Sequence, residues 1–107
     1  MDLTAEIYRL SRSLPSGERY GLASQMQRAA VSIAANIAEG YGRRGRVEFG
    51  RFLLIANGSL KELETHLIVA ERVGELPAGQ VNGALAQAEE IGKMLAGLIR
   101  SLEGRRP

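Results

Sequence analysis

The sequence of 107 residues is long enough for one domain and too short for a second independent core. It contains no cysteine, which excludes disulfides, thiolate chemistry and cysteine-based zinc or iron–sulfur sites. The net charge is +2, and twelve of the fourteen basic residues are arginine, which binds phosphate or carboxylate in a planar, bidentate manner. Residues 1–53 hold eight basic and five acidic side chains, whereas residues 54–107 hold six and seven.

No segment has the pattern of a signal peptide or a membrane span. The first ten residues carry alternating charges, and the longest uncharged run with the composition of a core, Ala29 to Ala38, is far shorter than the ~18 residues that a span requires. We therefore expect a cytoplasmic protein with no membrane partner.

The first two helices are predicted on either side of a Pro-Ser-Gly turn. The first runs from Asp2 to Leu14 and is ended by Pro15. Its apolar stripe, with intervals of three and four residues, consists of Leu3, Ile7, Leu10 and Leu14. The second runs from Glu18 to Gly40 or Gly42, and its stripe consists of Leu22, Met26, Ala30, Ile33 and Ile37.

The third and fourth helices follow a turn that contains three glycines, at positions 40, 42 and 45. The third is predicted from Val47 to Val73, with the stripe Phe49, Phe52, Leu53, Ala56, Leu60, Leu63, Leu67 and Ala70. The fourth begins at Pro77 and ends near Leu102, with the stripe Val81, Leu85, Ala88, Ile91, Leu95, Leu98 and Leu102. Short connections make neighbouring helices antiparallel. The sequence thus predicts one all-α domain over residues 1–107, an antiparallel up-and-down four-helix bundle with a short first helix.

Two features of this bundle leave alternatives open. The first helix is too short to cover the whole groove between its neighbours, so either that end is loose or another subunit covers it. Several glycines fall inside predicted helices at about 1 kcal/mol each relative to alanine, namely Gly21, Gly50, Gly58, Gly83, Gly92 and Gly97. They indicate either close helix–helix approach or glycines that the fold merely tolerates.

Catalytic and metal-binding patterns are missing from the sequence. The single histidine, His66, has no second histidine with which to form a metal site, and no nearby nucleophile that it would activate. Ser32 and Ser59 lie within predicted helices with no histidine near them. We therefore expect no enzyme activity, no catalytic residue, no metal and no cofactor.

Arginines cluster around the glycine-rich turn. Arg43, Arg44 and Arg46 lie within it, and Arg51 lies one turn into the third helix. Together with Arg19 and Arg28, these residues are candidates for a surface that binds nucleic-acid phosphates. The alternative is a solvated basic turn. Tyr41, beside the turn, is expected to cover the core rather than to stack on a base.

Polar residues also interrupt the apolar pattern of the second and third helices. Arg28, Ser32, Asn36 and Glu39 share one face of the second helix, and Ser59 and Glu62 lie on the third. These residues either face solvent or form a hydrogen-bond network, between helices or between subunits, that fixes helix register.

Much of the chain resembles the 23S rRNA intervening-sequence protein family. The matching positions are Ile7-Tyr8, Leu14-Pro15, Glu18-Arg19-Tyr20-Gly21-Leu22, Gln25, Arg28-Ala29-Ala30, Ser32-Ile33, Asn36-Ile37-Ala38-Glu39-Gly40, Phe49, Phe52-Leu53, Ile55-Ala56, Gly58-Ser59 and Glu62-Leu63. The sequence departs from the family pattern at Ala34, which replaces a frequent proline, and at Glu75, which replaces a frequent aromatic residue. Members usually begin some ten residues earlier, so this chain begins partway into the family's first helix, which would fit a truncated start and puts assembly at that end in doubt.

The resemblance implies a bacterial four-helix bundle related to the accessory variability proteins of diversity-generating retroelements, which form barrel-shaped homopentamers that bind nucleic acid and a reverse transcriptase. We expect a non-catalytic, RNA-binding or scaffolding protein that assembles as a ring-like homo-oligomer. The alternative is a protein-interaction module for a reverse transcriptase or another protein, with nucleic acid incidental.

Overall fold

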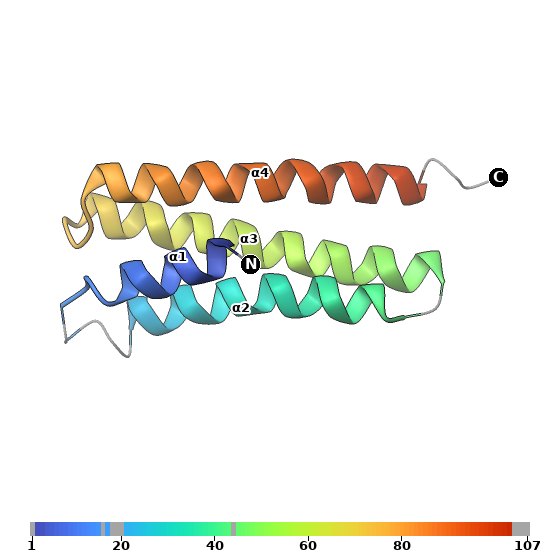
Figure 1. The fold of residues 1–107 in the computed structure, drawn as a ribbon, viewed down its shortest axis with the longest axis horizontal. Coiled ribbons are helices and arrows are strands. Elements are labelled where there is room, and N and C mark those ends of the chain that lie inside the picture. The colour runs from blue at the N-terminus through green and yellow to red at the C-terminus, as the bar shows by residue number, and fades with distance from the viewer. Residues whose placement is uncertain (1, 16, 18–20, 44, 104–107) are drawn as a thin grey trace.

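The computed structural model describes residues 2–15, 17, 21–43 and 45–103. Over these residues the chain forms four helices and no strand, namely α1 (Asp2–Ser11), α2 (Leu22–Tyr41), α3 (Arg46–Arg72) and α4 (Ala78–Glu103). They lie side by side along an axis of 51 Å, and successive helices run in opposite directions (Figure 1). The predicted all-α, antiparallel bundle with a short first helix is confirmed.

The four helices surround one apolar core. α2 and α3 form the most extensive contact, followed by α3 with α4 and α1 with α2, whereas α1 touches α4 only over a short stretch. The described residues of α2 and α4 make no direct backbone contact with each other, and neither do those of α1 and α3. Each helix is therefore adjacent to two others, and α3 has the longest stretch in contact with its neighbours.

Most of the predicted core residues are buried. From Leu53 onward, every residue of the predicted α3 stripe is fully enclosed. Leu98 was predicted wrongly, because its side chain is 41% exposed while Ile99 packs partly against the core instead. The start of α1, at Asp2 and Leu3, lies beside Ile91 of α4, and Leu98 lies about two turns further along α4, so α1 does not reach it.

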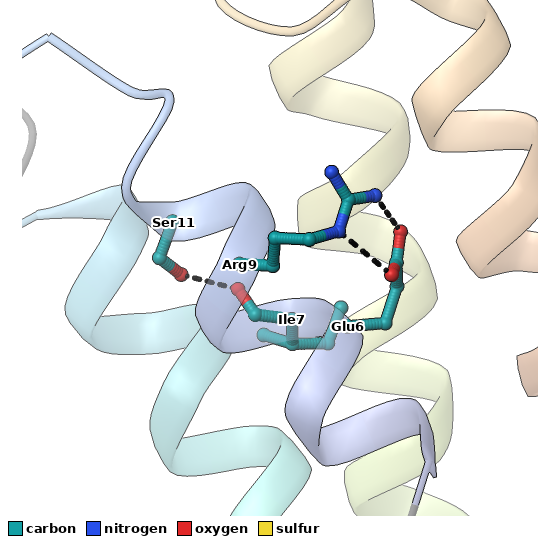
Figure 2. Close-up of polar contacts among 4 residues, drawn as sticks. All are labelled: Glu6, Ile7, Arg9 and Ser11. Carbon is teal, nitrogen blue, oxygen red and sulfur yellow. Dashed lines mark hydrogen bonds and ion pairs between the residues drawn. The ribbon is translucent and has the colours of Figure 1, made fainter.

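The first helix is shorter than predicted. The N–H groups of Ser13 and Leu14 donate to the carbonyl oxygens of Leu10 (2.9 Å) and Ser11 (3.2 Å), so three-residue turns replace the last α-helical turn. Leu14 nevertheless stays buried as predicted. Ser11, also buried, donates its hydroxyl to the carbonyl of Ile7 at 2.7 Å, which satisfies it inside the core (Figure 2).

The second helix is described from Leu22, and the predicted start at Glu18 lies outside the described residues. The third and fourth helices begin and end within one residue of the prediction. Gly45, at φ +97°, precedes α3, and Gly74, at φ +80°, follows it. Both backbone conformations favour glycine, so Gly45 lets the chain turn into α3 and Gly74 ends that helix.

The helix-interior glycines differ in what surrounds them. A Cβ at Gly92 would lie 3.4 Å from a methyl of Leu60 on α3, and one at Gly50 would lie 3.8 Å from Leu102 on α4, which are ordinary van der Waals distances. No neighbouring atom lies within 4 Å of the Cβ position at Gly58, Gly83 or Gly97. Packing within the described residues therefore leaves room for a Cβ at all five positions.

At one end of the bundle, α2, α3 and α4 pack together without α1. α1 lies beside only the first half of α2, so the far halves of α2 and α4 flank α3 with no helix between them (Figure 1). On α4, Met94 is 64% exposed at this end, near Leu98. No described helix is both long and apolar enough to cross a lipid bilayer.

Candidate nucleic-acid interface

The turn between α2 and α3 lies at the end of the bundle that α1 does not reach (Figure 1). The N–H groups of Gly42 and Arg43 donate to the carbonyls of Ala38 and Gly40, both at 3.1 Å, and the N–H of Phe49 donates to the carbonyl of Gly45 at 3.2 Å. These bonds involve carbonyls in the last turn of α2 and the first hydrogen-bonded amide of α3. Gly42 and Arg43 are therefore tied to the end of α2, and Gly45 is tied to the start of α3.

Aromatic side chains pack around Gly40 at the base of this turn. A Cβ at Gly40 would lie 2.7 Å from the Cβ of Phe52 and 3.2 Å from a ring carbon of Phe49. The ring of Phe49 in turn meets the ring of Tyr41 edge to face, with centroids 6.2 Å apart and planes at 84°. Tyr41 was expected to cover the core, but it is 82% exposed, so the expectation is wrong.

Two guanidinium groups flank the ring of Phe52. The Arg43 carbon Cζ lies 5.4 Å from the ring centroid, and that of Arg51 lies 5.6 Å from it. Glu39 accepts from Nε and Nη2 of Arg43 at 3.0 and 2.5 Å, and Glu48 lies 3.7 Å from Arg51. Exposed ion pairs of this kind are worth only about 0–1 kcal/mol, so neither carboxylate holds its arginine firmly.

The remaining predicted basic residues lie elsewhere or outside the described chain. Arg44 and Arg19 are not among the described residues, and Arg46 begins α3 beside the turn. Arg28 is exposed on α2, beside Tyr8 and Val31. It precedes Arg43 by fifteen residues, which is about 20 Å along a helix. The structure therefore groups Arg43, Arg46 and Arg51 and places Arg28 apart from them.

Sequence reasoning missed Arg100, an exposed residue in the last turn of α4. The end of α4 packs against the start of α3, where Leu102 and Ile99 line a shallow hollow together with Arg46 and Arg51. This places Arg100 at the same end of the bundle as the α2–α3 turn. Antiparallel topology was the available signal, because it brings the end of a fourth helix beside the beginning of a third.

Hydrogen bonds connect only part of the predicted polar network. The hydroxyls of Ser32 on α2 and Ser59 on α3 are 2.8 Å apart, and the amide of Asn36 donates to the carbonyl and the hydroxyl of Ser32 at 2.8 and 3.1 Å. Glu39 instead pairs with Arg43, and Arg28 is not bonded to these residues. Three of the six predicted residues thus form one inter-helix cluster.

Glu62, the sixth of these residues, lies beside the single histidine. Its Oε1 is 3.5 Å from Nε2 of His66, one turn further along α3, and the His66 side chain is 23% exposed. Nε2 is buried and has no hydrogen-bond partner within the described residues, so its contact with the exposed Glu62 carboxylate is not a hydrogen bond. Within the described ranges, no group of three or more His, Cys, Asp or Glu residues is placed to hold a metal ion.

The family model of the 23S rRNA-intervening sequence protein matches residues 1–97. The chain belongs to this family. A solved structure of a protein with unknown function from the S23 ribosomal protein family of Bacteroides thetaiotaomicron is 26% identical, with a TM-score of 0.85 over 92% of each chain. No curated protein matches the chain. The resemblance to the family is confirmed, and the arginine–aromatic cluster at the α2–α3 turn is the candidate site of this family member.

Proposed function

We propose that the protein is a non-catalytic, RNA-binding or scaffolding bundle that holds phosphates at the α2–α3 turn. The observation that carries the proposal is the placement of Arg43 and Arg51 on the ring of Phe52, at 5.4 and 5.6 Å. The ring restricts both guanidinium groups, so less conformational entropy is lost when they bind a phosphate. Arg46 and Arg100 add charge at the same end of the bundle.

The basic surface of one copy is small, and repetition in a homo-oligomer strengthens it. The family resemblance implies a ring-like pentamer, in which several weak patches act together on one RNA. Phosphate contacts fix position and carry no sequence information, so we expect little sequence preference from the arginines. The exposed apolar residues of α4 near the unfilled end of the bundle support assembly.

The test is the salt dependence of RNA binding, measured by fluorescence anisotropy with a labelled structured RNA. The Arg43→Ala/Arg51→Ala variant should bind more weakly, and the slope of log K against log salt should fall by about 0.7 to 0.9 for each phosphate that the variant no longer neutralises. Arg72→Ala, at the opposite end of α3, is the matched control and should bind as wild type.

A third variant, with Arg43, Arg44 and Arg46 all replaced by alanine, should lose most of the binding. Equal slopes for wild type and both turn variants would contradict phosphate recognition at this turn. No binding at low salt by a folded protein would contradict RNA binding altogether.

The second candidate function is an accessory role for a reverse transcriptase or another protein, with nucleic acid incidental. Two exposed apolar side chains on α3, Leu54 and Ile55, favour this second function. Neighbouring apolar side chains on a surface are typical of a site that binds another protein. The relation to diversity-generating retroelements belongs to this proposal. Co-elution with a purified retroelement reverse transcriptase, lost on Leu54→Lys, would support it, and separate elution would contradict it.

A further inference from the structure

Tyr41 is the most exposed of the large apolar and aromatic side chains in the described part of the chain. It is the last residue of α2, and its ring meets its neighbours mainly through the edge-to-face contact with Phe49. Most of the Tyr41 ring is in contact with water, so its apolar surface is still available for burial by a ligand. An exposed but oriented ring is suited to a flat, apolar ligand.

Contacts of Gly40 and Phe49 restrict the position of the Tyr41 ring. Gly40, the residue before it, packs against both phenylalanines of α3, so the end of α2 cannot turn without moving them. The contact between Tyr41 and Phe49 restricts the tyrosine ring further. At 82% exposure, the ring keeps a broad surface open to solvent. A ligand that stacks there therefore meets an open ring that is supported by its contact with Phe49.

A guanidinium group contacts the same aromatic group. Phe49 and Phe52 both border Gly40, Tyr41 contacts the ring of Phe49, and Arg43 lies over the ring of Phe52. An exposed ring and a cation thus rest on two neighbouring phenylalanines. A nucleotide presents the complementary pair of features, a flat base and a phosphate joined through a sugar.

We infer that Tyr41 stacks on an unpaired base of the RNA while Arg43 binds a neighbouring phosphate. The inference rests on the proposed function and narrows its ligand to single-stranded or loop nucleotides. Within a continuous duplex both faces of each base are covered by the adjacent pairs, so only unpaired bases are open to an aromatic ring. Stacking tolerates any base, which agrees with the lack of sequence preference that phosphate contacts imply.

The experiment compares two labelled RNAs that carry the same number of phosphates, an unstructured strand and a blunt duplex. Wild-type protein should bind the unstructured strand about tenfold more tightly, within the range that base–aromatic stacking supplies. Tyr41→Ala should remove that preference and leave duplex binding unchanged, whereas Tyr41→Phe should retain it. Tyr8→Ala, which removes a less exposed ring on α1, is the control and should bind both RNAs as wild type.

Circular dichroism confirms that each variant is folded before binding is measured. Equal binding of both RNAs by wild type, unchanged in Tyr41→Ala, would overturn the stacking inference and leave phosphate recognition intact. Failure of the folded protein to bind either RNA at low salt would overturn the proposed function and this inference together. Weaker binding of both RNAs to the same extent in Tyr41→Ala would also overturn the inference, because it would show a general effect of the substitution.

Discussion

Gly40 and Phe52 bring α2 and α3 so close that a Cβ at Gly40 would lie 2.7 Å from the Cβ of Phe52. Carbon atoms do not approach this closely without a shift, and the Phe52 Cβ is attached directly to the α3 backbone. The guanidinium groups of Arg43 and Arg51 both lie over the ring of Phe52. The contact between Gly40 and Phe52 therefore positions the ring that both arginines contact.

Gly40→Ala should destabilise the protein, whereas Gly58→Ala should stabilise it. Alanine gains about 1 kcal/mol of helix propensity at either position, but at Gly40 overpacking costs about 1–3 kcal/mol and outweighs the gain. No atom lies within 4 Å of a Cβ at Gly58, so the gain remains there. Urea denaturation of the two variants measures both changes in the free energy of unfolding. Stabilisation by Gly40→Ala would show that α2 and α3 are further apart than described.

Ser32 and Ser59 should be energetically coupled across the α2–α3 contact. Removing either hydroxyl leaves the other without its partner at 2.8 Å, so each alanine variant should cost about 1 kcal/mol and the double variant less than the sum. A double-mutant cycle measures the coupling. Ser32→Ala with Thr65→Ala is the matched control, because Thr65 bonds within α3 to the carbonyl of Lys61 and the two changes should be additive. A coupling indistinguishable from that of the control pair would contradict the bond.

The ion pair on α1 should make stability depend on pH. Glu6 accepts hydrogen bonds from Arg9, including one of 3.1 Å from Nε, and these bonds lower the pKa of the Glu6 carboxyl below its ordinary value of 4.5 (Figure 2). Because the pKa of Glu6 is lower in the folded protein than in the unfolded chain, the ion pair stabilises the fold fully above pH 4.5. This stabilisation disappears as the pH falls through the folded-state pKa of Glu6.

Glu6→Gln should therefore lower the urea midpoint at neutral pH and match wild type in strong acid. Because the pair is largely at the surface, the difference should be small and should shrink in high salt. Glu75→Gln, which removes a carboxylate from the turn between α3 and α4, is the control for the change in net charge. A midpoint difference that persists in strong acid would show that the glutamine acts through something other than this ion pair.

Assembly should depend on the apolar side chains that the short first helix leaves uncovered. Met94→Glu with Leu98→Glu should lower the mass measured by light scattering without unfolding the bundle, since both side chains are exposed in a single copy. Asn82→Glu with Ala86→Glu adds two carboxylates to the outer face of the same helix and should leave the mass unchanged. Equal masses for all variants would place the contact between copies elsewhere or show that the protein is monomeric.

Much of the fold followed from the spacing of apolar residues. The α3 stripe predicted the enclosed core from Leu53 to Ala70, because burial on one face of a helix imposes its period on the sequence. Leu98 continued the α4 stripe equally well and is nevertheless exposed. Periodicity records which face a residue lies on, but not whether a neighbouring helix extends far enough to cover it.

The candidate site was predicted less completely. Clustering in the turn drew attention to Arg43, Arg46 and Arg51, yet their roles in RNA binding stay predictions. Arg28 was included because of its charge, although α2 carries it away from the turn. Charge counts along a chain contain no information about distance across a bundle, and this also explains why Arg100 was missed.

The sequence by itself determined the all-α class, the number of helices, most of their ends and the family, because each depends on local patterns of apolar, glycine and proline residues. Only the tertiary structure decided that Tyr41 stands in solvent, that Arg43 and Arg51 share one ring, and that Ser32 meets Ser59. These relationships depend on how α2 and α3 are rotated and shifted against each other. That geometry is fixed by contacts such as Gly40 with Phe52, which join residues far apart in the chain.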